Sequence, residues 1–70
     1  MTKIIRKQLG KNLKEARLKA GMTQVEVADK AGIHPNYYAR IERGEANPSQ
    51  EKLFGVTKAL KVKSSKILPY

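Results

Sequence analysis

The side chains of this sequence that are best suited to recognise another molecule stand close together in "HPNYYAR", residues 34–40. Arg40 could make a bidentate contact with O6 and N7 of guanine, and Asn36 could pair with the N6/N7 edge of adenine or with a phosphate. His34 could donate to a phosphate or a base, and the Tyr37 hydroxyl could reach a phosphate. Pro35 presents only apolar surface, which suits the methyl group of thymine. These residue types indicate nucleic-acid binding, provided that the fold presents them on one surface.

No set of residues in this sequence is typical of an enzyme or a metal site. Cysteine is absent and His34 is the only histidine, which excludes zinc fingers, zinc ribbons and thiol chemistry. No nucleophile or orienting carboxylate is apparent beside His34, and the sequence has no phosphate-binding loop. We therefore predict that the protein is not an enzyme and needs no metal, cofactor or small-molecule ligand.

The charge of the chain points to a polyanionic partner. Lys and Arg number 15 against 6 Asp and Glu, so the formal net charge is +9. Such a charge favours DNA, RNA or an anionic membrane surface as partner and does not choose among them. No apolar run approaches the roughly 20 residues of a membrane-spanning helix, and "MTKIIRKQLG" lacks the apolar core of a signal peptide. We expect a cytoplasmic protein that does not bind membranes.

The apolar periodicity predicts helices throughout the first part of the chain. One stripe lies on a first helix that ends near residue 20, and consists of Ile5, Leu9, Leu13 and Ala16. Thr23 and Glu26 have the spacing of a capping box, so a second helix begins there and ends at Gly32. Pro35 suits the first position of a third helix, which places His34 at its N-cap. On that helix Tyr38 and Ile41 point together into the core, and Gly44 ends the helix.

The last part of the chain predicts two further helices. Ser49 caps a fourth helix, and residues 61–63 connect it to a short fifth helix capped by Ser64 or Ser65. The inner faces of these two helices are formed by Leu53, Val56, Leu60, Ile67 and Leu68. No segment alternates with period two, so we predict no strand and an all-α fold for residues 1–70 as a single domain.

Residues 24–43 have the spacing of a helix-turn-helix. Ala28 is small where the next helix crosses, and Gly32 permits the positive φ of a sharp turn. The wedge between the two helices is filled by Val27, Ala31, Tyr38 and Ile41. With "LGKNLKEARLKAGMTQVEVADKAGI", "YYARIERGEANPS" and "KLFGVTKAL", the chain resembles the Cro/C1-type (XRE-like) helix-turn-helix family over roughly residues 9–68. The resemblance implies a compact five-helix, lambda-repressor-like DNA-binding domain.

The resemblance also implies a role for each candidate residue. Residues 35–43 would be the recognition helix in the major groove, with base contacts from His34, Pro35, Asn36, Tyr37 and Arg40. Phosphate contacts would come from the start of the second helix and from the loop after the third, at Gln24, Arg43, Asn47 and Ser49, with Glu45 in the same loop. Arg17 and Glu42 would form a structural pair between the first and third helices. Two alternatives stay open: His34 could serve only as a cap, and Arg43 only as a partner of the helix dipole.

Three positions depart from the family pattern. Gly55 lies inside the fourth helix at a cost of about 0.5–1 kcal/mol relative to Ala, which suggests close approach of another helix or of a partner subunit. Lys61 stands where the family commonly has glycine, so we expect a differently built turn, and Gln50 replaces a commonly apolar residue. The apolar residues best placed for a dimer interface are Phe54, Val62, Leu68, Pro69 and Tyr70, with a core role as the alternative for Phe54 and Leu68.

These observations predict a sequence-specific transcriptional regulator that binds double-stranded operator DNA as a homodimer. The five helices account for the whole chain, so we expect no sensor domain. The family includes phage repressors, antitoxins and controller proteins of restriction–modification systems. Two other functions therefore remain open: an antitoxin-like or adaptor module that binds protein, and a basic protein that binds nucleic acid without sequence preference.

Overall fold

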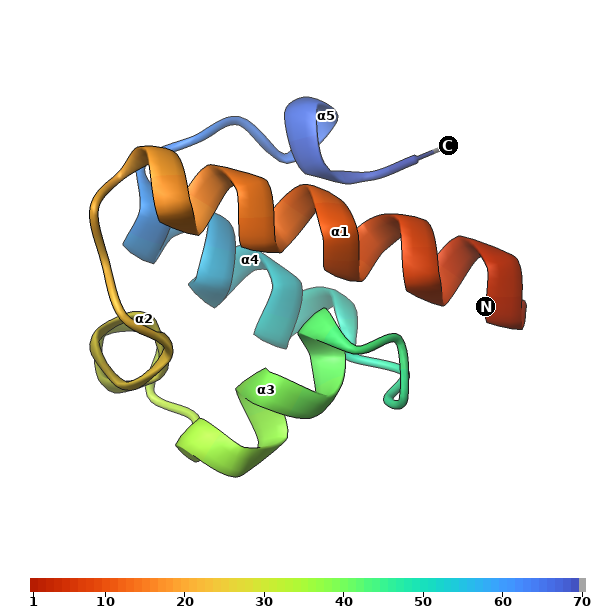
Figure 1. Cartoon of the computed structure of the whole chain (residues 1–70), viewed down its shortest axis with the longest axis horizontal. Coiled ribbons are helices and arrows are strands. Elements are labelled where there is room, and N and C mark those ends of the chain that lie inside the picture. Colours follow the sequence, from red (N-terminus) through yellow and green to blue (C-terminus); the bar gives the residue numbers. More distant parts are fainter. Residues whose placement is uncertain (70) are drawn as a thin grey trace.

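The computed structural model describes residues 1–69, which form five helices and no strand. The helices are α1 (Lys3–Lys19), α2 (Gln24–Ala31), α3 (Pro35–Glu42), α4 (Gln50–Leu60) and α5 (Ser64–Ile67). Figure 1 shows α1 crossing the molecule, with α5 on one side and α2 and α3 on the other. The predicted all-α, five-helix fold is confirmed.

Every helix contributes to one core. The apolar residues that are at most 5% exposed come from all five helices, and are Leu9, Leu13, Val27, Ala28, Tyr38, Ile41, Leu53, Val56, Leu60 and Ile67. The principal packing pairs are α2 with α4 and α1 with α3. The predicted inner faces are therefore correct, except that Ile5, Ala16, Ala31 and Leu68 are only half-buried.

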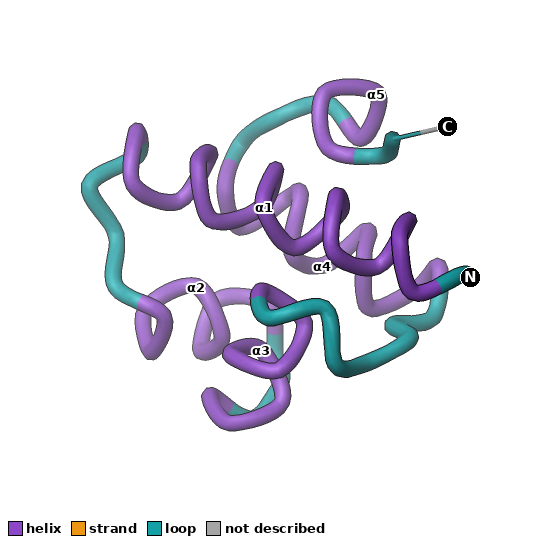
Figure 2. Tube along the Cα trace, turned by 45° about the vertical axis from the view of Figure 1, so that its right-hand side comes forward, coloured by secondary structure: helices purple, strands orange, loops and turns teal. Residues whose placement is uncertain are grey.

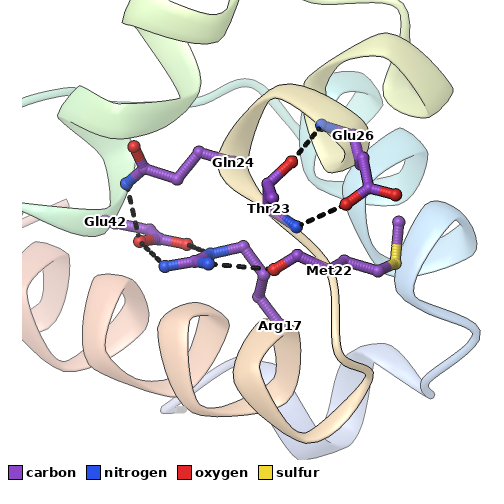
Figure 3. Close-up of polar contacts among 6 residues, drawn as sticks. All are labelled: Arg17, Met22, Thr23, Gln24, Glu26 and Glu42. Atoms are coloured by element: carbon purple, nitrogen blue, oxygen red, sulfur yellow. Dashed lines mark hydrogen bonds and ion pairs between the residues drawn. The ribbon is translucent and has the colours of Figure 1, made fainter.

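Helix caps account for most of the element boundaries. Thr23 and Glu26 form the predicted capping box: Thr23 Oγ1 accepts from the Glu26 amide at 3.1 Å, and the Thr23 amide donates to Glu26 Oε1 at 2.9 Å (Figure 3). Gly32 follows α2 with φ of +73°, as the sharp turn requires. Ser49 caps α4 as predicted, accepting from the Lys52 amide at 3.2 Å.

The predicted cap of the fifth helix is wrong. Lys63 occupies the N-cap position of α5 without a side-chain hydrogen bond, and Ser64 and Ser65 already lie inside the helix. The extended backbone ends at Lys63 (φ −75°, ψ 141°), so neither serine has the N-cap conformation. The short helix is fixed instead by Asn12 of α1, whose Nδ2 donates to the Ile67 carbonyl at 2.8 Å.

Two glycines allow close helix crossings. A Cβ at Gly10 would lie 2.5 Å from the Ile41 carbonyl oxygen and closer still to that of Glu42, so α1 crosses the end of α3 there. A Cβ at Gly55 would lie 3.2 Å from the Ala31 carbonyl oxygen. Of the two readings of Gly55, the structure therefore supports close approach of another helix of the same chain, namely α2.

The turn after α4 has the conformation of a glycine turn although it is built with lysine. Lys61 has φ of 57° and ψ of 40°, and the Val62 amide donates to the Thr57 carbonyl at 3.1 Å. Our expectation of a differently built turn is therefore wrong. The backbone must reverse here so that Ile67 can reach the core, and this requirement outweighs the steric cost of a left-handed lysine. Gln50 is exposed as the first residue of α4.

Replacing Lys61 with glycine is expected to stabilise the fold by about 1 kcal/mol, because it removes the left-handed strain of a residue with a Cβ. A shift of the denaturant midpoint at unchanged slope measures the gain. Lys58→Gly removes the same side chain from the helical part of α4 and should instead cost about 1 kcal/mol. Equal effects of the two substitutions would contradict this explanation of the turn.

Among the apolar residues proposed for a dimer interface, Phe54 is 65% exposed, which rules out a core role for it. Leu68 and Val62 are half-buried and pack against the core, and Pro69 is also half-buried. Tyr70 lies outside the described residues. Phe54 is therefore the member of this set that leaves the largest apolar side chain uncovered in the described part of the chain.

Candidate nucleic-acid interface

A buried polar cluster joins α1, α2 and α3 behind the predicted recognition helix (Figure 3). Arg17 donates to both carboxylate oxygens of Glu42, through Nε at 2.7 Å and Nη2 at 3.2 Å. Gln24 Nε2 donates to Glu42 Oε1 at 2.9 Å, and Arg17 Nη1 donates to the Met22 carbonyl at 3.0 Å. The structure thus brings the predicted pair Arg17 and Glu42 together and adds Gln24 as a third member.

The electrostatics of this cluster follow from burial and from charge-assisted hydrogen bonds. Burial by itself would raise the pKa of Glu42, but hydrogen bonds led by that of Arg17 hold this pKa below its ordinary value. The hydrogen bond to Glu42 raises the pKa of Arg17. Burial, followed by the side chain of Glu42, raises the pKa of the Tyr38 phenol, whose oxygen is buried without a hydrogen-bond partner among the described residues. At neutral pH the cluster therefore holds a guanidinium and a carboxylate, each 11% exposed or less.

Because the pKa of Glu42 is lowered in the folded chain, its carboxylate stabilises the fold fully above its ordinary pKa of 4.5. That contribution is lost as the pH falls through the lower, folded-state pKa. We expect the free energy of unfolding to fall as the pH is lowered below about 5. Denaturant titrations across this range should show a shallower fall for Glu42→Gln than for the native chain, and parallel curves would contradict the assignment.

The outer side of α3 carries the predicted base-reading residues. Asn36 and Arg40 are exposed and stand four positions apart, so they lie on the same face of the helix. His34 is also exposed, and Pro35 is half-buried. His34 Nδ1 accepts from the Asn36 amide at 3.0 Å, which makes His34 the N-cap of α3. A neutral imidazole that accepts at Nδ1 carries its proton on Nε2, so the cap leaves one ring donor of this exposed residue free.

Tyr37, one of the predicted base-reading residues, is only partly exposed. Its side chain is half-buried against the core, and the ammonium of Lys52 lies 5.4 Å from the centre of its ring. Tyr38, in contrast, is completely buried, as predicted. Tyr38 therefore belongs to the core, whereas Tyr37 lies at the border between the core and the outer face of α3.

The loop between α3 and α4 presents the predicted phosphate contacts next to that face. Arg43 makes a bidentate ion pair with Glu45 at 3.1 and 3.2 Å, and both side chains remain more than half exposed. Arg40 Nη2 donates to the Glu45 carbonyl at 3.2 Å. Asn47 and Ser49 are exposed, and the cap that Ser49 makes with its oxygen leaves its hydroxyl hydrogen free to donate.

Two residues of this surface were not singled out by sequence reasoning. Arg6 of α1 supports the loop, with Nε donating to the Gly44 carbonyl at 3.3 Å and Nη1 near Asn47 Oδ1 at 3.5 Å. Figure 2 shows the loop running from α3 past the N-terminal end of α1. Lys52 of α4 is the other residue. Arg6 and Asn47 are 41 positions apart, so no local pattern could have linked them.

Gln24 lies apart from the loop contacts, at the first position of α2. Its side chain is half-buried and bonded to Glu42, but Nε2 carries a second hydrogen that can be donated to a phosphate. Within residues 1–69, no group of three or more His, Cys, Asp or Glu side chains is placed to hold a metal ion. None of the described helices combines the length and the apolar character needed to cross a membrane.

Comparison with known proteins places this geometry in a family. Residues 13–67 match the model of the family described as helix-turn-helix. The chain is 37% identical over 68 residues to the transcriptional regulator ClgR of Mycobacterium tuberculosis, covering 97% of this chain but only 61% of that protein. It is 34% identical over 71 residues to the control protein C.BamHI of Bacillus amyloliquefaciens, covering 100% of this chain and 88% of that one.

A solved structure agrees with these matches. The restriction-modification controller protein C.AhdI from Aeromonas hydrophila superposes with a TM-score of 0.88 and 25% sequence identity, over 90% of this chain and 96% of that chain. The family match begins within α1, takes in α2, the turn and α3, and ends with α5. From this agreement of sequence and architecture it follows that the chain belongs to the helix-turn-helix family, as its resemblance to the Cro/C1-type regulators predicts.

Proposed function

We propose that this chain is a sequence-specific transcriptional regulator that inserts α3 into the major groove of double-stranded operator DNA. The observation that carries the proposal is the outer face of α3, where Asn36 and Arg40 are exposed together on a helix anchored from behind by Glu42. Pre-organisation of this kind lowers the entropic cost of reading a base edge. The net charge of +9 supports a polyanionic partner. A regulator of this kind would act in the cytoplasm.

Within this proposal the residues divide into two classes. His34, Pro35, Asn36, Tyr37 and Arg40 read bases, and Gln24, Arg43, Asn47 and Ser49 hold the phosphate backbone. Base contacts supply discrimination, whereas phosphate contacts fix register and orientation on the duplex. Gln24 precedes α3 in the chain, and the loop contacts follow it.

The relatives support a regulatory role of this kind. ClgR is named a transcriptional regulator, and C.BamHI a control protein. We further propose that the chain acts as a homodimer, which would read two half-sites roughly 34–36 Å apart, about one turn of DNA. Phe54, Val62, Leu68, Pro69 and Tyr70 remain the proposed interface.

Arg40→Ala is expected to cost about 1–3 kcal/mol of discrimination at one base pair of each half-site and to leave binding to unrelated DNA nearly unchanged. Gln24→Ala should weaken binding to all sequences by a similar factor, because it removes a phosphate contact. Selection from a random DNA pool, followed by titration of the selected site and its single-base variants, measures both effects. Uniform losses in both variants would contradict the division into reading and positioning residues.

The same selection separates the proposal from its alternatives. A pseudo-palindromic consensus with a guanine in each half-site supports a dimeric operator-binding regulator. Failure to enrich any sequence, with binding that collapses as salt rises, supports a non-specific nucleic-acid-binding protein. Weak binding to every duplex would favour the antitoxin-like or adaptor function.

A further inference from the structure

Lys52 stands beside the recognition helix although it belongs to α4. Its backbone amide donates to Ser49 Oγ at 3.2 Å, which fixes the first turn of α4. Its side chain is exposed, and its Nζ lies 5.4 Å from the centre of the Tyr37 ring. Because that ring packs against the core, it offers the ammonium a fixed support next to the outer face of α3.

In the described part of the chain, the ammonium of Lys52 is held by an aromatic ring and not by a carboxylate, and this difference decides what it can still bind. The two ion pairs among residues 1–69 are Arg17–Glu42 and Arg43–Glu45, so Lys52 is not paired with a carboxylate there. An aromatic face attracts a cation through the charge distribution of the ring, without neutralising its charge with a carboxylate. The ammonium of Lys52 therefore keeps its full charge and hydrogen-bond donors for an anion.

The position of Lys52 on its own helix also points to a role outside the fold. A cation in the first turn opposes the helix dipole, so Lys52 is mildly unfavourable for α4. A helix interior or last turn would accept the same side chain at no such cost. The placement makes physical sense if the cation meets an external negative charge at this end of α4, three residues after Ser49.

We propose that Lys52 is a further contact to the DNA phosphate backbone and that Tyr37 is the positioning residue that holds it. The proposal rests on the function proposed above and extends the phosphate-contacting surface from the α3–α4 loop to α4. Tyr37 positions Lys52 through the face of its ring. Its ring edge and hydroxyl remain available for the base contact proposed above.

The test measures the affinity of the full chain for the selected duplex and for a scrambled duplex across a salt series. Lys52→Gln is expected to make log K fall less steeply with log salt, by about 0.9 for each bound subunit, on both duplexes. Lys58→Gln removes the same charge from the last turn of α4 and serves as the matched control, for which the slope should stay unchanged. Thermal unfolding of each variant verifies that it is folded.

The role of Tyr37 is tested by coupling. Tyr37→Phe keeps the ring, so Lys52→Gln should change the slope in that background as it does in the native chain. Tyr37→Leu keeps only apolar packing, so the effect of Lys52→Gln should shrink there, and Tyr37→Leu by itself should weaken binding about two- to fivefold more than Tyr37→Phe, as expected for an exposed cation–π contact. Equal slope changes for Lys52→Gln and Lys58→Gln, or the same Lys52 effect in all three backgrounds, would overturn the proposal.

Failure of this inference can be told apart from failure of the proposed function. The salt slope is measured on any duplex, so it reports on Lys52 even if no sequence is selected from the pool. Conversely, a clear consensus with an unchanged slope in Lys52→Gln would leave the regulator standing and remove only the contact from α4.

Discussion

Glu42→Gln is expected to lower the free energy of unfolding by about 3–5 kcal/mol, the usual cost of removing one partner of a buried ion pair. The substitution keeps the shape of the side chain and removes its charge, so the guanidinium of Arg17 stays buried without a counter-charge. The side chain of Glu42 is 3% exposed and that of Arg17 is 11% exposed, so water cannot replace the lost partner. Domains of this size have a total stability of only about 4–10 kcal/mol, so the substitution should remove a large share of it.

Equilibrium denaturation monitored by helical circular dichroism measures this loss. Glu51→Gln is the matched control, because Glu51 is exposed and takes part in neither ion pair of the described residues. The double variant Arg17→Met, Glu42→Leu removes both charges and should regain much of the lost stability, since apolar replacement of a buried pair is often neutral. A loss in Glu42→Gln no larger than in the control would show that the pair contributes little.

Binding should fall together with stability in this series. Glu42 lies at the end of α3 and receives hydrogen bonds from α1 and α2, so it fixes how α3 is oriented against these two helices. A variant in which α3 is loosely held must be ordered before it can bind, and this reduces the apparent affinity. The double variant tests whether stability alone accounts for the binding loss.

Gly10→Ala is expected to destabilise the fold by about 3 kcal/mol, at the upper end of the usual cost of overpacking. The new methyl group would overlap the carbonyl oxygens of Ile41 and Glu42, which are backbone atoms and cannot turn aside as a side chain can. Relief requires α1 and α3 to move apart, which would also disturb the contact between Arg17 and Glu42. Thermal and chemical unfolding of the variant measure the loss.

Gly55→Ala is the matched control for this prediction. Its methyl group would lie 3.2 Å from the Ala31 carbonyl oxygen, so a shift of a few tenths of an ångström suffices. Alanine also favours a helix over glycine by about 0.5–1 kcal/mol, which offsets the small strain. We expect Gly55→Ala to be close to neutral, and a Gly10→Ala variant of equal stability would contradict the tight crossing at that point.

The sequence by itself determined the parts of this protein that depend on near neighbours along the chain. Thr23 and Glu26 are three residues apart and form their capping box within one helical turn. Tyr38 and Ile41 share the buried side of α3 because the helical period places them there. Gly32 takes a positive φ that other residues adopt at a cost. These local rules were sufficient to predict the five helices and the burial of Tyr38 and Ile41.

Other features depended on partners that are distant in sequence. Arg17 and Glu42 are 25 positions apart, and only the family resemblance suggested that they meet. Sequence reasoning did not predict the hydrogen bond from Gln24 to Glu42 or the approach of Arg6 to Asn47. It also did not predict the contact of the Lys52 ammonium with the Tyr37 ring.

The tertiary structure alone also decided where two helices approach each other closely through their backbones and where the chain reverses its direction. Gly10 reads as an ordinary small residue in a helix until α3 is packed against it. Lys61 takes the left-handed conformation because α5 has to return to α1, where Asn12 holds the Ile67 carbonyl. Periodicity and propensity describe one helix at a time, whereas crossing points and polar partners are set when several helices share one core.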